Sequence, residues 1–208
     1  EKIAYMPYSY QVNVSNRDVS QDPVSRYEHG LPKKGFVFCC FNNNYKITIS
    51  VFSVWMRILL AVEDSVLWLL ENESITKKNL IQEAEKFGIN KDRLVFAKMV
   101  PVEDHLSRIR LADLFIDTLP CNAHTTASDA LRMGVPVLTC LGESFASRVA
   151  ASLLSALKLH SLITSNHSEY ESLAIELATQ PKKLKAIKDI LAISLSSETL
   201  YNAKLFTQ

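Results

Sequence analysis

The residues of this chain with the clearest potential for chemistry are His124, Thr125 and Thr126, an imidazole followed by two hydroxyls. They stand between a short apolar run over 114–117 and a segment with apolar residues at helical spacing. The first amides of a helix lack internal partners and its dipole is positive there, so an anion gains hydrogen bonds and charge stabilisation together. The pattern is typical of a phosphate site that a diphosphate would fit. The alternative is that Thr125 or Ser128 only caps the helix.

A second polar group follows the apolar run over 36–41. Asn42, Asn43 and Asn44 supply amide donors, and Lys46 supplies one mobile positive charge. A pyrophosphate leaving group needs this chemistry when no metal is bound. The alternative for Lys46 is a solvated surface charge, but its place after a buried strand favours a site.

Three further side chains each have a binding interpretation and a structural one. His105 stands one turn into a predicted helix, where it could stack on a base or lie at the surface. His124 could bond a phosphate oxygen or be a satisfied polar group in its loop. Asp129 could accept from a ribose hydroxyl or only favour the helix dipole. The residues alone leave these alternatives open.

The elements that must position these residues follow a βα repeat. This alternation predicts an α/β fold, a parallel sheet with helices on both faces, in which ligands bind outside the carboxyl ends of the strands. All the polar groups above follow strands, so we expect them on one rim. The predicted strands cover 36–41, 65–70, 94–99, 114–117, 135–140 and 159–164, and the predicted helices cover 51–62, 77–87, 103–112, 168–180, 181–194 and 198–206.

Composition excludes several classes of protein. The 208 residues are 48% hydrophobic and carry a net charge of +1, which is ordinary for a globular protein with a sizeable core. The 23 basic and 22 acidic residues nearly balance, which argues against a nucleic-acid partner. The apolar stretches are too short to span a bilayer, and the first residues carry no targeting pattern. We therefore predict a cytoplasmic protein with no nucleic-acid or membrane partner, and the spacing of its four cysteines predicts buried thiols rather than a metal site.

Several motifs follow one another along the chain: Phe41–Ile47, Arg93–Phe96, Leu111–Asp113, Cys121–Thr126, Gly142–Ser144 and Ala146–Ser152. In this order they resemble the O-linked N-acetylglucosamine (O-GlcNAc) transferase family, above all its bacterial members with tetratricopeptide repeats. The resemblance covers nearly the whole chain and implies the C-terminal, nucleotide-sugar lobe of a GT-B glycosyltransferase, with a Rossmann-like parallel sheet. It implies an inter-lobe segment over 1–34, a UDP-sugar-binding lobe over 35–196 and a C-terminal helix over 197–208 that packs on the other lobe.

The resemblance also implies roles at the phosphates. Lys46 would neutralise the diphosphate of the leaving UDP and is the one catalytic residue expected in this chain. Asn43 would bond the same group, and His124, Thr125 and Thr126 would wrap the phosphates at the start of the helix. The animal enzymes have Gln where Asn43 stands, and the shorter Asn side chain reaches less far.

At the nucleoside, the resemblance implies that Asp129 holds the ribose. The backbone of Val100 and the side chains of His105 and Arg108 would recognise uracil, His105 by stacking and Arg108 by hydrogen bonding. The animal enzymes have a Lys that contacts the ribose where Val102 stands, so either donor binding is weaker here or another residue substitutes.

The implied reaction is inverting transfer of N-acetylglucosamine (GlcNAc) from UDP to Ser or Thr of protein acceptors, without a metal or other cofactor. The general base and the acceptor groove would lie in the missing lobe and repeats, so the chain alone is expected to bind and not to turn over. Exposed apolar residues near the C-terminus, Leu200, Tyr201, Leu205 and Phe206, would favour self-association. The alternatives are a nucleotide-sugar-binding module without catalysis, a scaffold whose site has decayed, and a transferase that uses GDP-fucose or a UDP-hexose.

Overall fold

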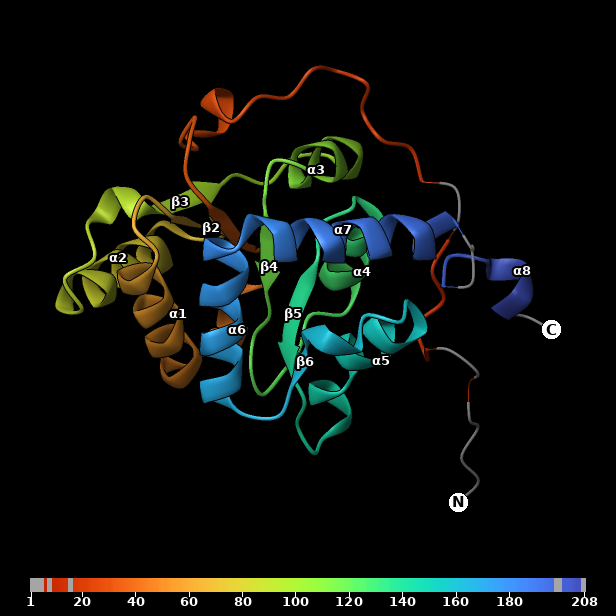
Figure 1. Cartoon of the computed structure of the whole chain (residues 1–208). Helices are drawn as coiled ribbons and strands as arrows, with labels where there is room; N and C mark the ends of the chain where they lie inside the picture. The colour runs from red at the N-terminus through yellow and green to blue at the C-terminus, as the bar shows by residue number, and fades with distance from the viewer. Residues whose placement is uncertain (1–5, 7–8, 15–16, 197–199, 207–208) are drawn as a thin grey trace.

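The computed structural model describes residues 6, 9–14, 17–196 and 200–206, which form a parallel six-stranded sheet covered by helices (Figure 1). The strand order is β3-β2-β1-β4-β5-β6. The strands are β1 Val37–Cys40, β2 Val66–Leu70, β3 Leu94–Ala97, β4 Leu114–Ile116, β5 Val137–Cys140 and β6 Ile163–Thr164. The helices are α1 Ile49–Ala61, α2 Ser74–Lys86, α3 Val102–Ile109, α4 Thr125–Arg132, α5 Val149–Ala156, α6 His167–Thr179, α7 Pro181–Ser196 and α8 Ala203–Phe206.

The strand order explains where the helices lie. The chain moves outward from β1 to β3, returns to β4 beside β1, and moves outward again to β6. Right-handed crossovers therefore place α1 and α2 on one face and α3, α4 and α5 on the other. Helix α6 crosses back and packs against α1. All carboxyl ends of the strands meet at one rim, and the loops after β1 and β4 are neighbours there.

The core fills both faces of the sheet, which is why the strands are near-continuous apolar runs. All four residues of β1 are buried, and Trp55 of α1 donates to the hydroxyl of Tyr170 of α6 at 3.2 Å. All four cysteines are free thiols, and Cys39, Cys40 and Cys140 are buried as predicted, whereas Cys121 is only partly buried. No helix within the described residues has the length and apolar content to cross a bilayer.

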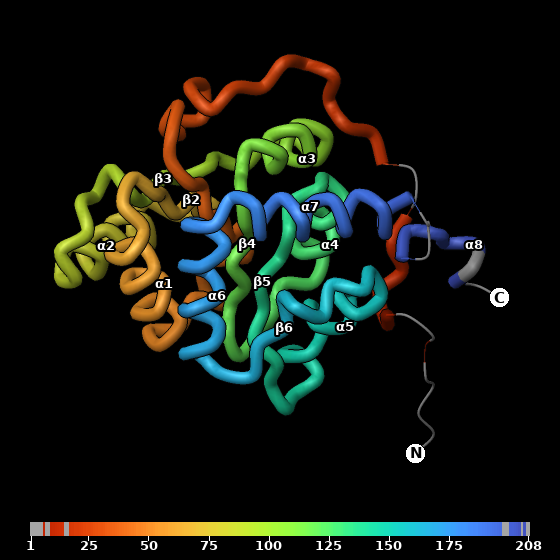
Figure 2. Tube along the Cα trace, viewed as in Figure 1, coloured from red at the N-terminus to blue at the C-terminus, as the bar shows by residue number. Residues whose placement is uncertain are grey.

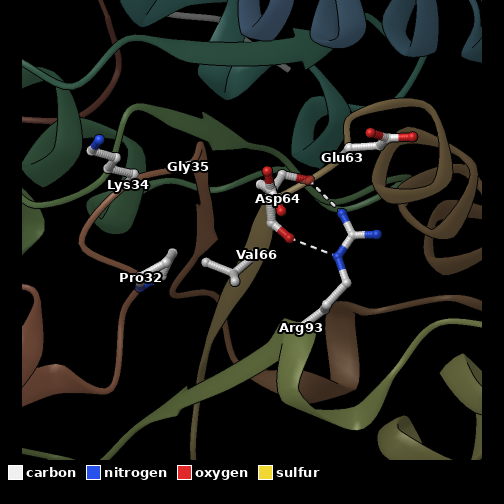
Figure 3. A pocket seen from close by; sticks show the side chains of 8 residues that line it. Pro32, Lys34, Gly35, Glu63, Asp64, Val66 and Arg93 are labelled. Atoms are coloured by element: carbon white, nitrogen blue, oxygen red, sulfur yellow. Dashed lines mark hydrogen bonds between the residues drawn. The ribbon is translucent and has the colours of Figure 1, made fainter.

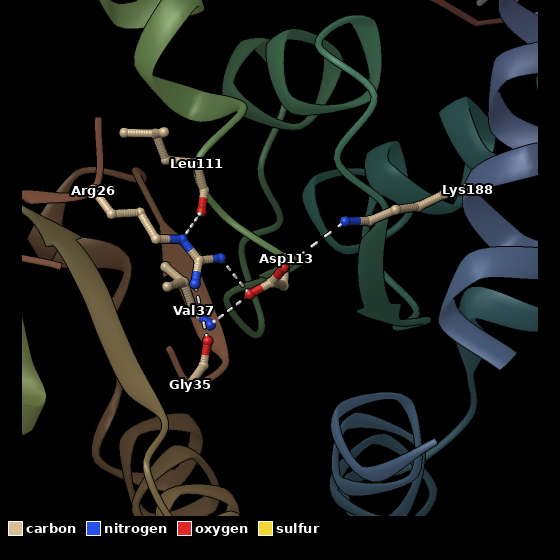
Figure 4. A network of polar contacts seen from close by, with 6 residues as sticks. All are labelled: Arg26, Gly35, Val37, Leu111, Asp113 and Lys188. Atoms are coloured by element: carbon tan, nitrogen blue, oxygen red, sulfur yellow. Dashed lines mark hydrogen bonds and ion pairs between the residues drawn. The ribbon is translucent and has the colours of Figure 1, made fainter. Parts of the chain in front are cut away.

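The segment over 17–36 arcs over α3 and enters the sheet at the amino ends of the strands (Figure 2). Arg26 anchors it (Figure 4): its guanidinium pairs with Asp113 at 2.8 Å and donates to the carbonyls of Leu111 and Gly35. The same Asp113 oxygen accepts from the amide of Val37, the first residue of β1, at 2.9 Å. The entry to the lobe is therefore held by one partly buried ion pair.

The sequence predicted all six strands, and the ends of most of them to within two residues. The last strand is shorter than predicted because His160–Leu162 forms a 3-10 turn. Of the helix expected over 198–206, only α8 forms within the described residues, and 197–199 lie outside them. The boundaries at 34 and 196 between segment, lobe and C-terminal helix stay predictions.

The expected exposure of the C-terminal apolar residues is wrong for Leu200 and Tyr201, which keep only 6% and 8% of their surface. The hydroxyl of Tyr201 donates to the carbonyl of Ser128 at 2.8 Å, and the Arg132 guanidinium lies 4.6 Å from the centre of its ring. Tyrosine can bury its ring and still pair its hydroxyl, so it packs on α4 of its own lobe. Self-association stays a prediction that these two residues no longer support.

Candidate functional site

The turn after β1 and the loop after β4 are joined by Lys46. Its Nζ donates to the carbonyl of Asn122 at 2.9 Å. Lys46 ends a short 3-10 turn that Asn43 caps by accepting from the amide of Tyr45. The ammonium is thus half-buried at the rim and already directed at the loop that leads into α4. The surface-charge interpretation of Lys46 is wrong.

Asn42 connects the same two segments from below. Its side chain is buried, donates to the hydroxyl of Thr118 at 2.6 Å and accepts from the hydroxyl of Thr126. Asn43, by contrast, is exposed, and its side-chain oxygen accepts from Asn72 at 3.0 Å. Of the asparagines after β1, Asn42 therefore positions the site and Asn43 lies at its open edge.

The start of α4 carries no side-chain cap. Thr125, its first residue, is exposed, and the hydroxyl of Thr126 is committed to Asn42. Ser128 donates to the side-chain oxygen of Asn13 at 2.6 Å. The capping interpretation of these hydroxyls is therefore wrong. The first amides of a helix lack intrahelical partners, and Lys46 binds the carbonyl of Asn122 in the loop that leads into α4, which is an arrangement suited to an anion.

His124 immediately precedes α4 and has one unpaired ring nitrogen. Its Nδ1 lies 2.8 Å from the hydroxyl of Tyr10, whereas its Nε2 is buried and has no hydrogen-bond partner among the described residues. Burial and the charge of Lys46 lower the pKa of His124, against the backbone of Ala146, which lies near enough to the ring to raise it, so the ring is neutral near pH 7. An unpaired buried polar atom is costly, and a ligand oxygen at the start of α4 would satisfy it.

Beneath the loop lies Asp117, whose carboxylate is completely buried. One oxygen accepts from the amides of Thr118 at 2.7 Å and Ala123 at 2.6 Å, and the other accepts from the hydroxyl of Thr139 at 2.7 Å. Burial raises the pKa of Asp117 to about 7, against these hydrogen bonds and the charge of Lys46, which lower it.

His105 and Arg108 form a second cluster on α3. Arg108 is 3% exposed, donates to the carbonyl of Lys98 at 2.8 Å, and its Nε donates to Nδ1 of His105 at 3.1 Å. The His105 ring meets the edge of Phe41 with centroids 4.9 Å apart. Burial, with a contribution from Arg108, lowers the pKa of His105 to about 4, so the ring is neutral. The surface interpretation of His105 is wrong.

Three other predicted positions flank these clusters. Val100 and Val102 are exposed just before and at the start of α3. Asp129 is 8% exposed and pairs with Arg17 at 2.7 Å. Burial raises the pKa of Asp129, opposed by Arg17 and Arg132. An effect on the helix dipole alone does not describe Asp129, because its carboxylate has a specific cationic partner.

A broad hollow of about 730 Å³ lies at the opposite, amino-terminal edge of the sheet (Figure 3). The Arg93 side chain beside it donates to the carbonyls of Val62 at 2.7 Å and Ser65 at 2.8 Å. This guanidinium already binds backbone oxygens, and the residues with unpaired or convergent polar atoms lie on the other rim. The hollow is therefore not the candidate site.

The model of the family named Glycosyl transferase family 41 matches residues 1–208. The chain belongs to that family. The resemblance drawn from the motifs is confirmed, and the fold is the predicted Rossmann-like lobe of a GT-B glycosyltransferase. In such a parallel sheet, Lys46 and the start of α4 lie at the rim formed by the carboxyl ends of the strands, where ligands usually bind.

The curated relatives of this chain carry names that fit this family. The chain is 38% identical over 201 residues to a protein of Arabidopsis thaliana named "Probable UDP-N-acetylglucosamine--peptide N-acetylglucosaminyltransferase SEC", covering 93% of this chain and 20% of that protein. It is 37% identical over 183 residues to the UDP-N-acetylglucosamine–peptide N-acetylglucosaminyltransferase of Caenorhabditis elegans, covering 88% and 16%. The chain thus spans a fifth or less of the length of these curated relatives.

Solved structures agree as well. A variant of the Thermobaculum terrenum O-GlcNAc transferase superposes with a TM-score of 0.88 at 29% identity, covering 100% of this chain and 39% of that one. Sucrose-phosphate synthase from Thermosynechococcus elongatus superposes with a TM-score of 0.62 at 12% identity, covering 87% and 45%. The second likeness shows the fold alone.

Sequence reasoning missed three residues of the candidate site, Tyr10, Arg17 and Asp117, and it named Asn42 only as one of the amide donors after the first strand. Asp117 follows directly on a buried strand, and this position was the available signal. No local pattern marks Tyr10 or Arg17, because they meet α4 from 114 and 112 residues away.

Proposed function

We propose that this chain is the donor-binding lobe of an inverting protein O-GlcNAc transferase, which moves GlcNAc from UDP to Ser or Thr of acceptor proteins. The observation that carries the proposal is the half-buried Lys46 ammonium beside the uncapped start of α4. Family membership and the names of the relatives support the choice of donor. The whole protein is proposed to be cytoplasmic and to carry tetratricopeptide repeats.

The lobe's chemical part is stabilisation of the leaving UDP. As the bond to the sugar breaks, negative charge grows on the diphosphate, and Lys46 would exchange the carbonyl of Asn122 for a phosphate oxygen. The first amides of α4, the unpaired nitrogen of His124 and the hydroxyl of Thr125 would donate to the same group. Thr126 would contribute its amide, because its hydroxyl donates to Asn42. Removing one preorganised donor of this kind typically raises the barrier by about 3 kcal/mol. The protein's own charges do this work, so the proposed reaction needs no metal.

The nucleoside would lie toward α3. We propose that His105 stacks on uracil and that Arg108 and the backbone of Val100 hydrogen-bond it. The neutral ring of His105, held by Arg108, suits stacking against a base. Asp129 would accept a hydrogen bond from the ribose, either after its ion pair with Arg17 breaks or while that ion pair remains.

Asn43 would reach the diphosphate from the open edge of the site, where its exposed side chain is now bound to Asn72. The general base and the acceptor groove would lie outside this chain. The chain spans only a fifth or less of its curated relatives, so we propose that alone it binds the donor without transferring the sugar.

Transfer of radiolabel from UDP-GlcNAc to protein acceptors by the complete protein tests this function. We expect transfer by the unaltered protein and its loss in Lys46→Ala. Lys78→Ala, which removes an exposed lysine of α2, is the matched control and should transfer normally. Tight UDP binding without any transfer by the complete protein would favour a binding module instead. Thermal protection by GDP-fucose or UDP-glucose but not by UDP-GlcNAc would indicate another donor.

A further inference from the structure

The carboxylate of Asp117 contacts several segments of the site without reaching solvent. It has 0% exposure, so it cannot touch a ligand. Its partners are backbone amides and uncharged side chains rather than an ion-pair partner. A buried carboxylate is costly, and it is retained where its hydrogen bonds hold something in place.

One oxygen of Asp117 holds both ends of the loop before α4. The amides of Thr118 and Ala123 both donate to Oδ1, at 2.7 and 2.6 Å. Within the loop, the Thr118 hydroxyl donates to the carbonyl of Cys121 at 2.7 Å and the Asn122 side chain donates to the carbonyl of Thr118 at 3.1 Å. The loop is therefore closed on a single acceptor atom.

The other oxygen fixes that acceptor to the sheet. Oδ2 accepts from the hydroxyl of Thr139 in β5 at 2.7 Å, so the same carboxylate connects the loop to the neighbouring strand of the sheet. Two site elements depend on the loop's position. Ala123 leads directly into His124 and α4, and the carbonyl of Asn122 holds Nζ of Lys46 at 2.9 Å.

We propose that Asp117 is a positioning residue for the donor's diphosphate: by closing the loop over 118–123, its carboxylate sets where Lys46 and the first amides of α4 point. This inference rests on the proposed function. It predicts that Asp117 acts on the phosphates of the donor and not on the nucleoside, whose proposed contacts lie on α3.

The test compares the affinities of UDP and uridine, measured by calorimetry on the complete protein. Asp117→Ala removes the acceptor and should weaken UDP about tenfold or more while uridine affinity stays unchanged. Asp117→Asn keeps an acceptor oxygen at the same place and should restore much of the UDP affinity. Asp113→Ala is the matched control, because it removes a carboxylate that also accepts from an amide, but at the opposite end of β4.

Each outcome decides the proposal. Asp117→Ala that binds UDP like the unaltered protein overturns it, and so does an equal loss for UDP and uridine, which would indicate a general structural role. An unaltered protein that binds no UDP overturns the proposed function itself. If Asp117→Ala does not fold, the amide resonances of Thr118 and Ala123 in the unaltered protein give the answer: UDP should shift both and uridine neither, and unchanged resonances with bound UDP contradict the proposal.

Discussion

Two aspartates flank β4, and they do different work at the two ends of one strand. Asp113 lies at the amino end, keeps 23% of its side-chain surface and has two cationic partners, Arg26 at 2.8 Å and Lys188 at 3.9 Å. Asp117 lies at the carboxyl end, is completely buried and binds amides and hydroxyls. The first fastens the incoming chain, whereas the second shapes a loop at the rim where ligands bind.

The two ends of β4 differ in how their charged side chains are paired. At the amino end, Arg26 and Lys188 both pair with the Asp113 carboxylate. At the carboxyl end the nearest cation, Lys46, binds a neutral carbonyl instead of the carboxylate. Its full charge therefore remains available to an anionic ligand, which is the property that a site for a diphosphate requires.

The largest change in UDP affinity is expected when the lysine at the carboxyl end of β4 is removed, and none when the lysine at the amino end is removed. Lys46→Ala should weaken UDP binding about a hundredfold, because a half-buried charge opposite a diphosphate is worth about 3 kcal/mol. Lys188→Ala should leave the affinity unchanged, since that lysine contacts Asp113 at the other end. Calorimetric titration of both variants with UDP is the measurement, and equal affinities in the two would remove the distinction.

The next effect concerns stability rather than binding. Arg26→Ala should lower the free energy of unfolding by about 2 kcal/mol, because it leaves the Asp113 carboxylate and the carbonyls of Leu111 and Gly35 without their donor. Urea denaturation measures this loss. The exposed pair of Arg57 and Glu171 is the control, and Arg57→Ala should cost less than about 1 kcal/mol. A UDP affinity that fell with Arg26→Ala would contradict its purely structural role.

A smaller effect appears in the pH dependence of stability. Because the folded protein lowers the pKa of His105 to about 4, this residue stabilises the fold fully above its unfolded pKa near 6.5 and loses that contribution as pH falls toward 4. The shift bounds the effect at roughly 3 kcal/mol, and partial exposure of the ring reduces it toward roughly 1 kcal/mol. His105→Gln should flatten the unfolding free energy between pH 7 and 4, and parallel curves for the two proteins would refute the assignment.

The smallest effect is expected from Tyr10. Tyr10→Phe removes the hydroxyl at Nδ1 of His124 and should weaken UDP binding by about 1 kcal/mol or less, because the pair is exposed. Tyr27→Phe, at a residue that is 91% exposed, is the control and should change nothing. Tighter UDP binding in the Tyr10 variant would mean that this hydroxyl competes with the ligand instead of orienting the ring.

The sequence predicted the sheet and the rim because both depend on local patterns. Buried parallel strands are apolar throughout, and ligand residues follow such strands, which was enough to predict a site at Lys46 and Thr125. The role of Asp117 could not be predicted, since an aspartate after an apolar run has the same appearance whether its amides fold back onto it or not. Likewise, the burial of Tyr201 depends on packing against α4, which lies 73 residues earlier in the chain.

A crystal structure of the protein with bound UDP would show directly whether Lys46 and the start of α4 bind the diphosphate. We predict the diphosphate within hydrogen-bond distance of Nζ of Lys46 and of the first amides of α4, with Nε2 of His124 paired to a phosphate oxygen. UDP bound at the hollow beside Arg93, or a Lys46 that still holds the carbonyl of Asn122 and touches no phosphate oxygen, would contradict it.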